Sequence, residues 1–255
     1  MGNLDGHVAL ITGAARGMGR AHAVRLAAEG ADIIAVDICA EFDSTDYPGS
    51  TSADLATTVE LVENHGRRIL ARQADVRDPE ALDRVVADGV REFGRLDIVI
   101  ANAGIIRVTD SDDRHRTFRD VIEVNLIGAW NTVDAAIPAL IAGGRGGSVV
   151  LVSSTQGIKA SGTDRPGIQA YGASKRALVA LMQGWALQLA PHSIRVNAIH
   201  PSGVATDMII NESTMGLAAA GDPWLTSQQN ALPIALMRPE DIAGAVAWLV
   251  SDAAA

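Results

Sequence analysis

The fold is decided by the stretch His7-Val8-Ala9-Leu10-Ile11-Thr12-Gly13-Ala14-Ala15-Arg16-Gly17-Met18-Gly19, close to the N-terminus. Its first six residues form a short run of mainly aliphatic and β-branched side chains, which is typical of a buried strand. A glycine-rich turn follows, and the Ala-rich segment 18–29 then has a helical pattern. The stretch therefore predicts a strand, a tight turn and a helix, the first βα unit of a parallel sheet.

The same alternation continues along the chain. Runs with strand character follow at 32–37, 68–75, 96–102, 148–153 and 194–200. Helical patterns lie between and after them, at 53–65, 79–93, 121–142, 171–189 and 239–250. Six strands separated by helices predict an α/β fold of the Rossmann type, with one doubly wound parallel sheet and right-handed crossovers. No change of composition and no internal repeat divides the sequence, so we expect one domain over residues 1–255.

The composition fits this fold and narrows the choice of partners. The chain is 48% hydrophobic but only 4% aromatic, which indicates a core of Ala, Val, Leu and Ile, as in a parallel sheet covered by helices. Lys and Arg total 21 and Asp and Glu total 30, so the formal charge is −9, and there is no basic block. We therefore expect neither nucleic acid nor an anionic membrane as a partner.

Cysteine usage and hydropathy bear on the compartment. Cys39 is the only cysteine, so it has no internal disulfide partner, and no Cys/His cluster has the spacing of a zinc site. We expect no metal. The first residues lack the pattern of a secretory signal, and no apolar run reaches the length of a membrane span. These features are typical of a soluble cytoplasmic protein, which is our expectation.

The glycine turn is a candidate phosphate site. Gly13 permits the turn, Gly17 lets the backbone approach a ligand, and Gly19 lets the helix and strand pack closely. A diphosphate fits at the N-terminus of the following helix, where free N–H groups and the positive end of the helix dipole point. The spacing is G-x-x-x-G-x-G, because His22 stands where G-x-G-x-x-G would have glycine. A glycine turn that serves only the path of the chain therefore stays an alternative.

An acidic residue follows at the distance that a dinucleotide site requires. Asp37 ends the second predicted strand, 18 residues beyond Gly19. Its carboxylate can accept hydrogen bonds from the ribose hydroxyls of adenosine and would repel a 2′-phosphate, which favours NAD over NADP. Arg16, in the turn, is a cation that could partly accommodate such a phosphate.

Three motifs stand in order on the predicted elements: T-G-x-x-x-G-x-G at 12–19, Asn102-Ala103-Gly104, and Tyr171-x-x-x-Lys175. With these motifs the chain resembles the short-chain dehydrogenase/reductase family over nearly its whole length. The resemblance implies an NAD-dependent enzyme that moves a hydride between a secondary alcohol or its ketone and a nicotinamide. It also implies a homotetramer, with a dimer as the alternative. The family normally has a seventh strand, which we expect to be missing from a sequence that ends at Ala255.

The resemblance assigns four catalytic residues. Tyr171 matches the general acid/base, Lys175 its activating partner, Ser154 the serine that polarises the carbonyl, and Asn125 the asparagine of the proton relay. Tyr171 and Lys175 are four residues apart, so they share a helix face, and we expect the ammonium to lower the pKa of the phenol from about 10. Ser153 competes with Ser154 for the serine role, and the family pattern selects Ser154.

The resemblance also implies a set of cofactor contacts. Asp75 and Val76 match positions at the adenine, 102–104 match the ribose, and 201–206 match the carboxamide, although the glycine of this last segment is displaced by one position. The full set of implied cofactor residues is Gly13, Arg16, Gly17, Met18, Gly19, Asp37, Ile38, Asp75, Val76, Asn102, Ala103, Gly104, Tyr171, Lys175, Pro201, Val204 and Thr206. His200, just before this segment, either touches cofactor or substrate or has a structural role.

Three segments, 38–52, 158–169 and 209–232, are longer than plain connections. Long excursions at the carboxyl ends of strands build the sites of such folds, so we expect a substrate loop at about 205–235, with Trp224 and Met215 as an apolar lid. A solvated loop is the alternative. The first two segments are also similar to the carveol dehydrogenase-like and mycofactocin-coupled subgroup. That likeness implies cyclic or terpenoid alcohols, a tightly held nicotinamide and a peptide-derived redox partner.

Two other classes of function stay open at this point. A nucleotide-binding sensor or scaffold without catalysis would not need Asn125, Ser154, Tyr171 and Lys175, all of which are present. A nucleotide-sugar epimerase or dehydratase would share the Tyr and Lys but usually has another glycine spacing and a longer substrate domain. We therefore expect the dehydrogenase.

Overall fold

The computed structural model describes residues 2–159, 162–227 and 232–254 and contains one parallel sheet. Its six strands are arranged in the order β3-β2-β1-β4-β5-β6, and every neighbouring pair is parallel. The strands are β1 (Val8–Thr12), β2 (Asp32–Asp37), β3 (Ile69–Gln73), β4 (Ile98–Ala101), β5 (Gly147–Val152) and β6 (Ile194–Ile199). This confirms the predicted α/β fold and all six predicted strands.

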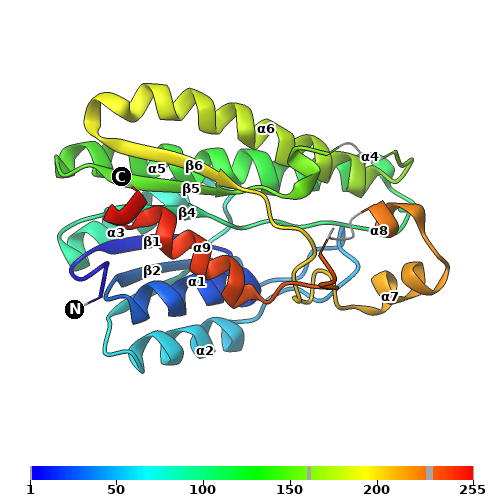
Figure 1. The fold of residues 1–255 in the computed structure, drawn as a ribbon, viewed down its shortest axis with the longest axis horizontal. Coiled ribbons are helices and arrows are strands. Elements are labelled where there is room, and N and C mark those ends of the chain that lie inside the picture. The colour runs from blue at the N-terminus through cyan, green and yellow to red at the C-terminus, as the bar shows by residue number, and fades with distance from the viewer. Residues whose placement is uncertain (1, 160–161, 228–231, 255) are drawn as a thin grey trace.

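Helices cover both faces of the sheet (Figure 1). One face carries α1 (Gly17–Ala28), α2 (Ser52–Glu63) and α9 (Pro239–Val250). The other carries α3 (Pro79–Phe93), α4 (Arg114–Ile122), α5 (Gly128–Gly143) and α6 (Pro166–Leu189). The short helices α7 (Glu212–Ala219) and α8 (Pro223–Ser227) lie apart from these layers, at the opposite end of the molecule from both termini. Short 3-10 turns occur at Thr155–Gly157, Ala190–His192 and Asp252–Ala254.

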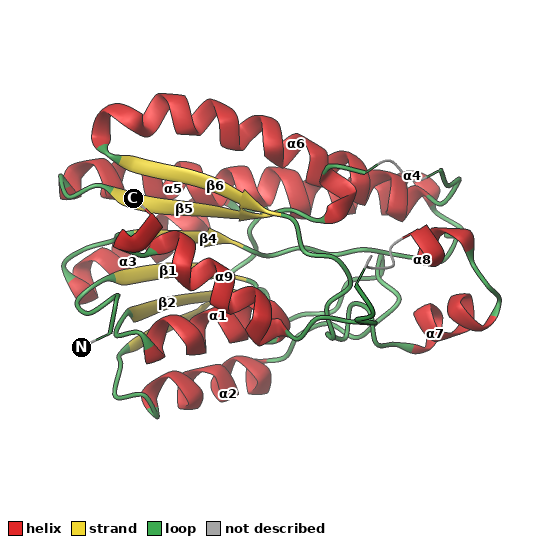
Figure 2. Cartoon of the chain, viewed as in Figure 1, coloured by secondary structure: helices red, strands yellow, loops and turns green. Residues whose placement is uncertain are grey.

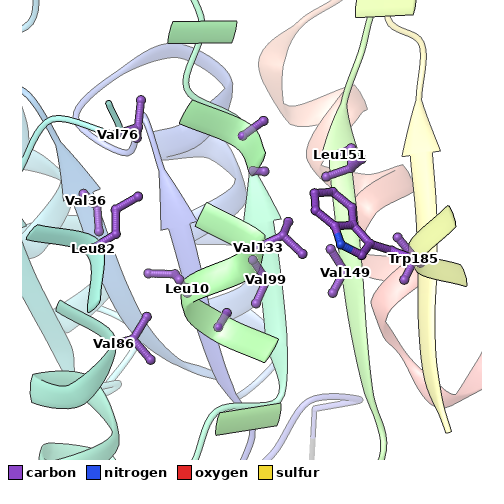
Figure 3. Close-up of a cluster of buried hydrophobic side chains, with 14 of the residues drawn as sticks. Leu10, Val36, Val76, Leu82, Val86, Val99, Val133, Val149, Leu151 and Trp185 are labelled. Atoms are coloured by element: carbon purple, nitrogen blue, oxygen red, sulfur yellow. The ribbon is translucent and has the colours of Figure 1, made fainter. Parts of the chain in front are cut away.

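The core lies in two layers, one on each face of the sheet. Side chains alternate along β1, so that Val8 and Leu10 join the layer under α3, α5 and α6, whereas Ala9 and Ile11 join the layer under α1 and α9. Figure 3 shows part of the first layer, in which strand residues face Val133 of α5 and Trp185 of α6. Burial on both faces explains why the strands are almost continuous apolar runs.

Two helices begin earlier than we predicted. The helical run predicted over 121–142 begins at Arg114, because the Asp113 side chain caps it by accepting a hydrogen bond from the Arg116 N–H at 2.9 Å. The helix predicted from Tyr171 begins at Pro166, whose fixed φ suits a first helical position. Part of the segment 158–169 is therefore helix, and residues 160–161 of it, like 228–231 of the segment 209–232, are outside the described residues.

The run Arg114–Gly143 is unusually apolar. By length and composition it is the one helix among the described residues that could cross a membrane, with a mean hydropathy of 1.3 over its most apolar window. It packs instead on the protein itself, since α4 lies against α6, α5 lies against α3, and Val121, Val133 and Leu140 are buried in the core. These contacts account for its apolar face.

The carboxyl ends of the strands meet at the end of the molecule that carries α7 and α8, as the arrowheads of β5 and β6 show in Figure 2. β1 lies between β2 and β4, so the chain leaves the sheet in opposite directions on either side of it. A doubly wound sheet has its crevice at such a switch point. The segments after β1, β2, β4, β5 and β6 therefore converge on one region.

Candidate active site

The glycine turn after β1 is packed tightly against the end of β4. Gly13 has φ +67°, and a Cβ placed on it would lie 2.9 Å from Ala103 Cα. A Cβ on Gly19 would lie 1.9 Å from the Gly13 carbonyl oxygen, so only glycine fits. The Asn102 side chain fixes the turn by donating from Nδ2 to the Thr12 carbonyl oxygen at 2.9 Å. Sequence and geometry agree here, because close approach of two backbones requires glycine.

A pocket opens between this turn and the ends of β2, β3 and β4. Of the residues expected to contact the cofactor, these line it: Gly13, Arg16, Gly17, Met18, Gly19, Asp37, Ile38, Asp75, Val76, Asn102, Ala103, Gly104 and Thr206. Four of the expected residues do not: Pro201, Val204, Tyr171 and Lys175. The Pro201 carbonyl oxygen accepts a hydrogen bond from the Thr155 N–H at 3.0 Å, and Val204 is buried beside Met237. Their predicted contacts with a cofactor stay predictions.

Asp37 is buried at the edge of the pocket and already accepts three hydrogen bonds. The donors are the Ala15 N–H at 2.9 Å, the Cys39 N–H at 3.1 Å and the Ser50 hydroxyl at 2.5 Å. A carboxylate has about four lone-pair sites, so acceptor capacity remains for a further donor.

Arg16 lines the pocket, as expected, and is also paired within the protein. Its guanidinium forms an ion pair with Asp207 at 2.9 Å, donates to the Pro48 carbonyl oxygen and lies 5.9 Å from the centre of the Tyr47 ring. These two contacts use two of its five N–H donors, so accommodation of a 2′-phosphate by Arg16 stays a prediction. Arg16 links the turn to two loops.

One of these loops covers the pocket, and we call residues 38–51 the strap. Strap residues line the pocket at Ile38, Ala40, Phe42, Thr45, Tyr47, Gly49 and Ser50. The Asp46 carboxylate holds the strap to the loop after β4, accepting from the N–H groups of Val108 at 2.6 Å and Thr109 at 3.0 Å and from the Thr109 hydroxyl at 2.5 Å. The sequence indicated a long segment here, but it did not single out Tyr47 or Asp46.

The candidate catalytic side chains meet beside Gly104. Asn125 is fully buried in a π-helical turn, Glu123–Ile127, and its amide clamps Ile105 by accepting from the N–H at 2.7 Å and donating to the carbonyl oxygen at 2.9 Å. A Cβ on Gly104 would lie 3.3 Å from Asn125 Oδ1 and 3.4 Å from Lys175 Nζ. The structure therefore brings Asn125 and Lys175 together, and single π-helical turns are frequent at functional sites.

Tyr171 and Lys175 lie on one face of α6, with the Lys175 ammonium 5.5 Å from the centre of the Tyr171 ring. Burial raises the pKa of Tyr171, and a hydrogen bond with Ser154 acts in the opposite direction. Burial lowers the pKa of Lys175 to about 8, and its amine donates to the Val152 carbonyl oxygen at 2.8 Å. Burial thus decides the direction of the Tyr171 pKa here, and the lowering expected from Lys175 is not seen.

The two adjacent serines have separate partners. The Ser153 hydroxyl donates to the Lys175 carbonyl oxygen at 2.7 Å and is thereby used within the fold. The Ser154 side chain is the one that reaches Tyr171. His200 lies behind this pair, with Nδ1 2.9 Å from the Ser154 carbonyl oxygen, so it contacts the serine turn rather than the pocket.

An apolar cluster adjoins Tyr171. Ile106, Val108, Ile168 and Trp224 are buried in it, and Tyr47, Tyr171, Met208, Leu217 and Leu225 pack against it. Arg165 joins two of its loops, pairing with Asp222 at 2.9 Å and donating to the Val108 carbonyl oxygen at 2.8 Å. Of the two residues expected to form an apolar lid, Trp224 is buried in this cluster and Met215 is 64% exposed and outside it, and the lid itself stays a prediction.

This combination defines a class of protein: a dinucleotide-binding α/β fold with a Ser, Tyr and Lys cluster at the pocket. The chain belongs to the short-chain dehydrogenase family, whose model matches residues 7–215. It is 54% identical to an uncharacterised oxidoreductase of Mycobacterium tuberculosis over 98% of this chain and 92% of that one. It is an oxidoreductase, which sets aside the epimerase.

Two further relatives have named activities or ligands. The chain is 44% identical to (−)-trans-carveol dehydrogenase of Rhodococcus erythropolis over 99% of this chain and 93% of that one. The crystal structure of carveol dehydrogenase from Mycobacterium avium in complex with NAD is 44% identical, with a TM-score of 0.93, and the match covers 100% of this chain and 94% of that one. The likeness to carveol dehydrogenases inferred from the sequence is confirmed.

Proposed function

We propose that this protein is an NAD-dependent dehydrogenase that interconverts a secondary alcohol and its ketone. The observation that carries the proposal is the cluster of the buried Ser154 and Lys175 with the partly buried Tyr171, beside a pocket whose wall is the glycine turn. The cluster also argues against a scaffold. Placing a lysine and a tyrosine together out of solvent costs free energy, and such groups are found mostly at functional sites.

The residues would share the reaction as follows. Tyr171 takes the hydroxyl proton of the alcohol, or returns it to the ketone, while Ser154 donates a hydrogen bond to the reacting oxygen. A bound nicotinamide supplies the hydride acceptor for oxidation and the hydride donor for reduction. Lys175 supplies positive charge next to the phenol, and Asn125 is a positioning residue that fixes the backbone at Ile105.

NAD is the proposed cofactor, in preference to NADP. The solved relative from Mycobacterium avium binds NAD. In this chain the buried Asp37 carboxylate lines the pocket, and Arg16 is paired with Asp207. A 2′-phosphate at Asp37 would meet a negative charge, and the Asp207 carboxylate offsets the positive charge of Arg16. Pro201, Val204 and Thr206 are the proposed neighbours of the carboxamide.

The proposed substrates are apolar cyclic or terpenoid alcohols. Tyr171 packs against an apolar cluster that contains Ile106, Val108, Ile168 and Trp224, so its surroundings are apolar. The relative from Rhodococcus erythropolis is a carveol dehydrogenase. The loop at about 205–235 would close over such a substrate, with Trp224 as its inner face.

We further propose that the cofactor stays bound between turnovers and passes its electrons to a peptide-derived redox partner. The strap covers the pocket and is tied down at two places, through Asp46 to the loop after β4 and through Pro48 to Arg16. Slow exchange of the cofactor would require an external acceptor for each turnover.

A homotetramer in the cytoplasm is the proposed state. Phe118, Ile127 and Trp130 are exposed apolar side chains on the helical run 114–143, and contact with further copies would cover them. Cys39 is a free thiol among the described residues, as suits a reducing compartment. Light scattering on the purified protein measures the number of copies.

The test of the function begins with purified protein. We would denature it, identify any released nucleotide by mass, and in parallel follow reduced nicotinamide with carveol and added NAD. Released NAD(H) with turnover only after addition of an electron-accepting dye supports the held cofactor. An empty protein that reduces added NAD supports an exchanging dehydrogenase. Failure to oxidise any secondary alcohol under either condition contradicts the proposed function.

A further inference from the structure

The strap does more than cover the pocket, because it brings one aromatic residue to the substrate side. Tyr47 lines the pocket and also packs against the apolar cluster that Tyr171 adjoins. The other end of the strap lies at the ribose side, where Ser50 bonds to Asp37. Tyr47 is therefore placed between the pocket and the apolar cluster.

The hydroxyl of Tyr47 accepts a hydrogen bond but donates none to the described residues. Its oxygen accepts a hydrogen bond from the Ile106 N–H at 3.3 Å. Among the described parts of the chain no acceptor receives the Tyr47 O–H itself, although a buried phenol normally donates to a partner. Thr45, in the same strap, differs in this respect, since its hydroxyl lies 3.0 Å from the carbonyl oxygens of Phe42 and Tyr47.

The environment keeps the Tyr47 hydroxyl a donor. Burial raises the pKa of Tyr47, and the hydrogen bond from the Ile106 backbone and the charge of Arg16 oppose this only in part. The nearby Tyr171 hydroxyl acts in the raising direction too, because two phenolates would repel each other. Burial thus favours the protonated form of both phenols, of which Tyr47 lines the pocket and Tyr171 packs with it against the apolar cluster.

We propose that Tyr47 is a specificity residue that donates a hydrogen bond to a second oxygen of the substrate, remote from the carbon that is oxidised. The preferred substrates are then cyclic secondary alcohols or ketones that carry an additional hydroxyl or carbonyl oxygen. The apolar cluster holds the ring, Tyr171 and Ser154 hold the reacting oxygen, and Tyr47 selects the second one. This inference rests on the proposed function and deepens it.

The test compares Tyr47→Phe with Thr57→Val, which removes a hydroxyl at an exposed position of α2 outside the pocket. The substrates are 4-methylcyclohexanol, which lacks a second oxygen, and the 1,3- and 1,4-cyclohexanediols, which place that oxygen at two positions. In holoenzyme, Tyr47→Phe should lower the ratio of kcat/KM for at least one diol over 4-methylcyclohexanol by about 3- to 10-fold, the range for one neutral hydrogen bond. Thr57→Val should leave this ratio unchanged.

A ratio that Tyr47→Phe leaves unchanged for both diols overturns the proposal, as does an equal loss with the diols and the methyl compound. The second result would mean that the variant only disturbs Ile106, whose N–H loses its acceptor. Bound nucleotide is measured in each variant, and loss of nucleotide without a change in the ratio would assign the Tyr47 hydroxyl to the cofactor instead.

A binding measurement separates this inference from the proposed function. With the cofactor oxidised, ketones bind without turnover, and calorimetry gives Kd for cyclohexane-1,4-dione and cyclohexane-1,3-dione against 4-methylcyclohexanone. A lower preference for a dione in Tyr47→Phe supports the role of Tyr47 even if no alcohol is oxidised. Turnover of alcohols with no such change in preference leaves the proposed function standing and removes the role of Tyr47.

Discussion

Arg16 and Asp207 form an ion pair of 2.9 Å that joins the glycine turn to the segment leading into α7. The Asp207 side chain is 61% exposed, so solvent screens the pair and it contributes little, about 1 kcal/mol or less. A second contact at the pocket, which holds the strap to the loop after β4, is buried. Asp46, with a side chain that is 5% exposed, accepts three hydrogen bonds from Val108 and Thr109. The hydrogen bonds of Asp46 should therefore stabilise the closed pocket more than the Arg16–Asp207 ion pair does.

Cofactor retention tests this difference. Asp46→Ala removes a buried acceptor of three hydrogen bonds, and we expect bound nucleotide to dissociate about 10- to 100-fold faster. Asp207→Ala removes only the exposed pair and should change the rate by less than about 3-fold. Gel filtration at timed intervals, followed by mass analysis of the remaining nucleotide, gives both rates. Equal rates in the two variants would mean that the Asp46 contacts do not hold the strap.

Tyr171 is the residue whose loss should separate binding from chemistry. Tyr171→Phe removes the proton donor and acceptor but leaves the glycine turn and strap intact, so nucleotide content should stay that of the unaltered protein. Turnover of a secondary alcohol should fall by about 100- to 10,000-fold, the contribution of a positioned acid/base. Single-turnover absorbance of reduced nicotinamide measures the step. Full activity in this variant would remove Tyr171 from the mechanism.

The sequence was sufficient for the parts of this molecule that depend on local pattern. The strands are runs buried on both faces, and Gly13 and Gly19 are required by contacts that form wherever a βα turn meets a neighbouring strand. Tyr171 and Lys175 are four residues apart, which is about one turn of α6. Each of these features is written within a few neighbouring residues, so the sequence predicts them without knowledge of distant contacts.

The contacts of the strap and the pKa of Tyr171 could not be predicted from local sequence in that way. Asp46 bonds to Val108 and Thr109, far along the chain, and Tyr47 takes its place from those bonds rather than from any periodicity. The pKa of Tyr171 is raised by burial, whereas the sequence led us to expect that Lys175, four residues away, would lower it. Long-range pairing and desolvation appear only when the elements are packed together.

The preference for NAD should depend on the charge of Asp37. Asp37→Asn keeps an acceptor oxygen for the Ala15 N–H but removes the charge that repels a 2′-phosphate. We expect the ratio of NAD to NADP affinity to narrow by about 10-fold, since unit charges a few ångströms apart at a protein surface interact by more than 1 kcal/mol. Ser50→Ala is the control, because it removes a neighbour of Asp37 without changing charge. Calorimetry on nucleotide-free protein gives the ratio, and no change in Asp37→Asn would mean that another residue reads the ribose.

His22 should make the stability of the fold depend on pH. Its side chain is fully buried on α1, neither ring nitrogen has a hydrogen-bond partner among the described residues, and burial lowers its pKa from 6.5 to about 4. The unfolded chain binds the proton more readily than the folded one, so the stabilisation is complete above pH 6.5 and is lost as the pH falls from 6.5 towards 4. The loss should reach roughly 3 kcal/mol of unfolding free energy over that window.

Urea unfolding at a series of pH values measures this loss, and the comparison between variants isolates the histidine from the carboxylates that titrate in the same range. His22→Leu removes the titrating group, so its unfolding free energy should decline less steeply below pH 6.5 than that of the unaltered protein. His115→Leu, at an exposed position of α4, should leave the slope unchanged. Parallel slopes in all three proteins would show that His22 takes up its proton without unfolding, through an opening of α1 that admits water to the ring.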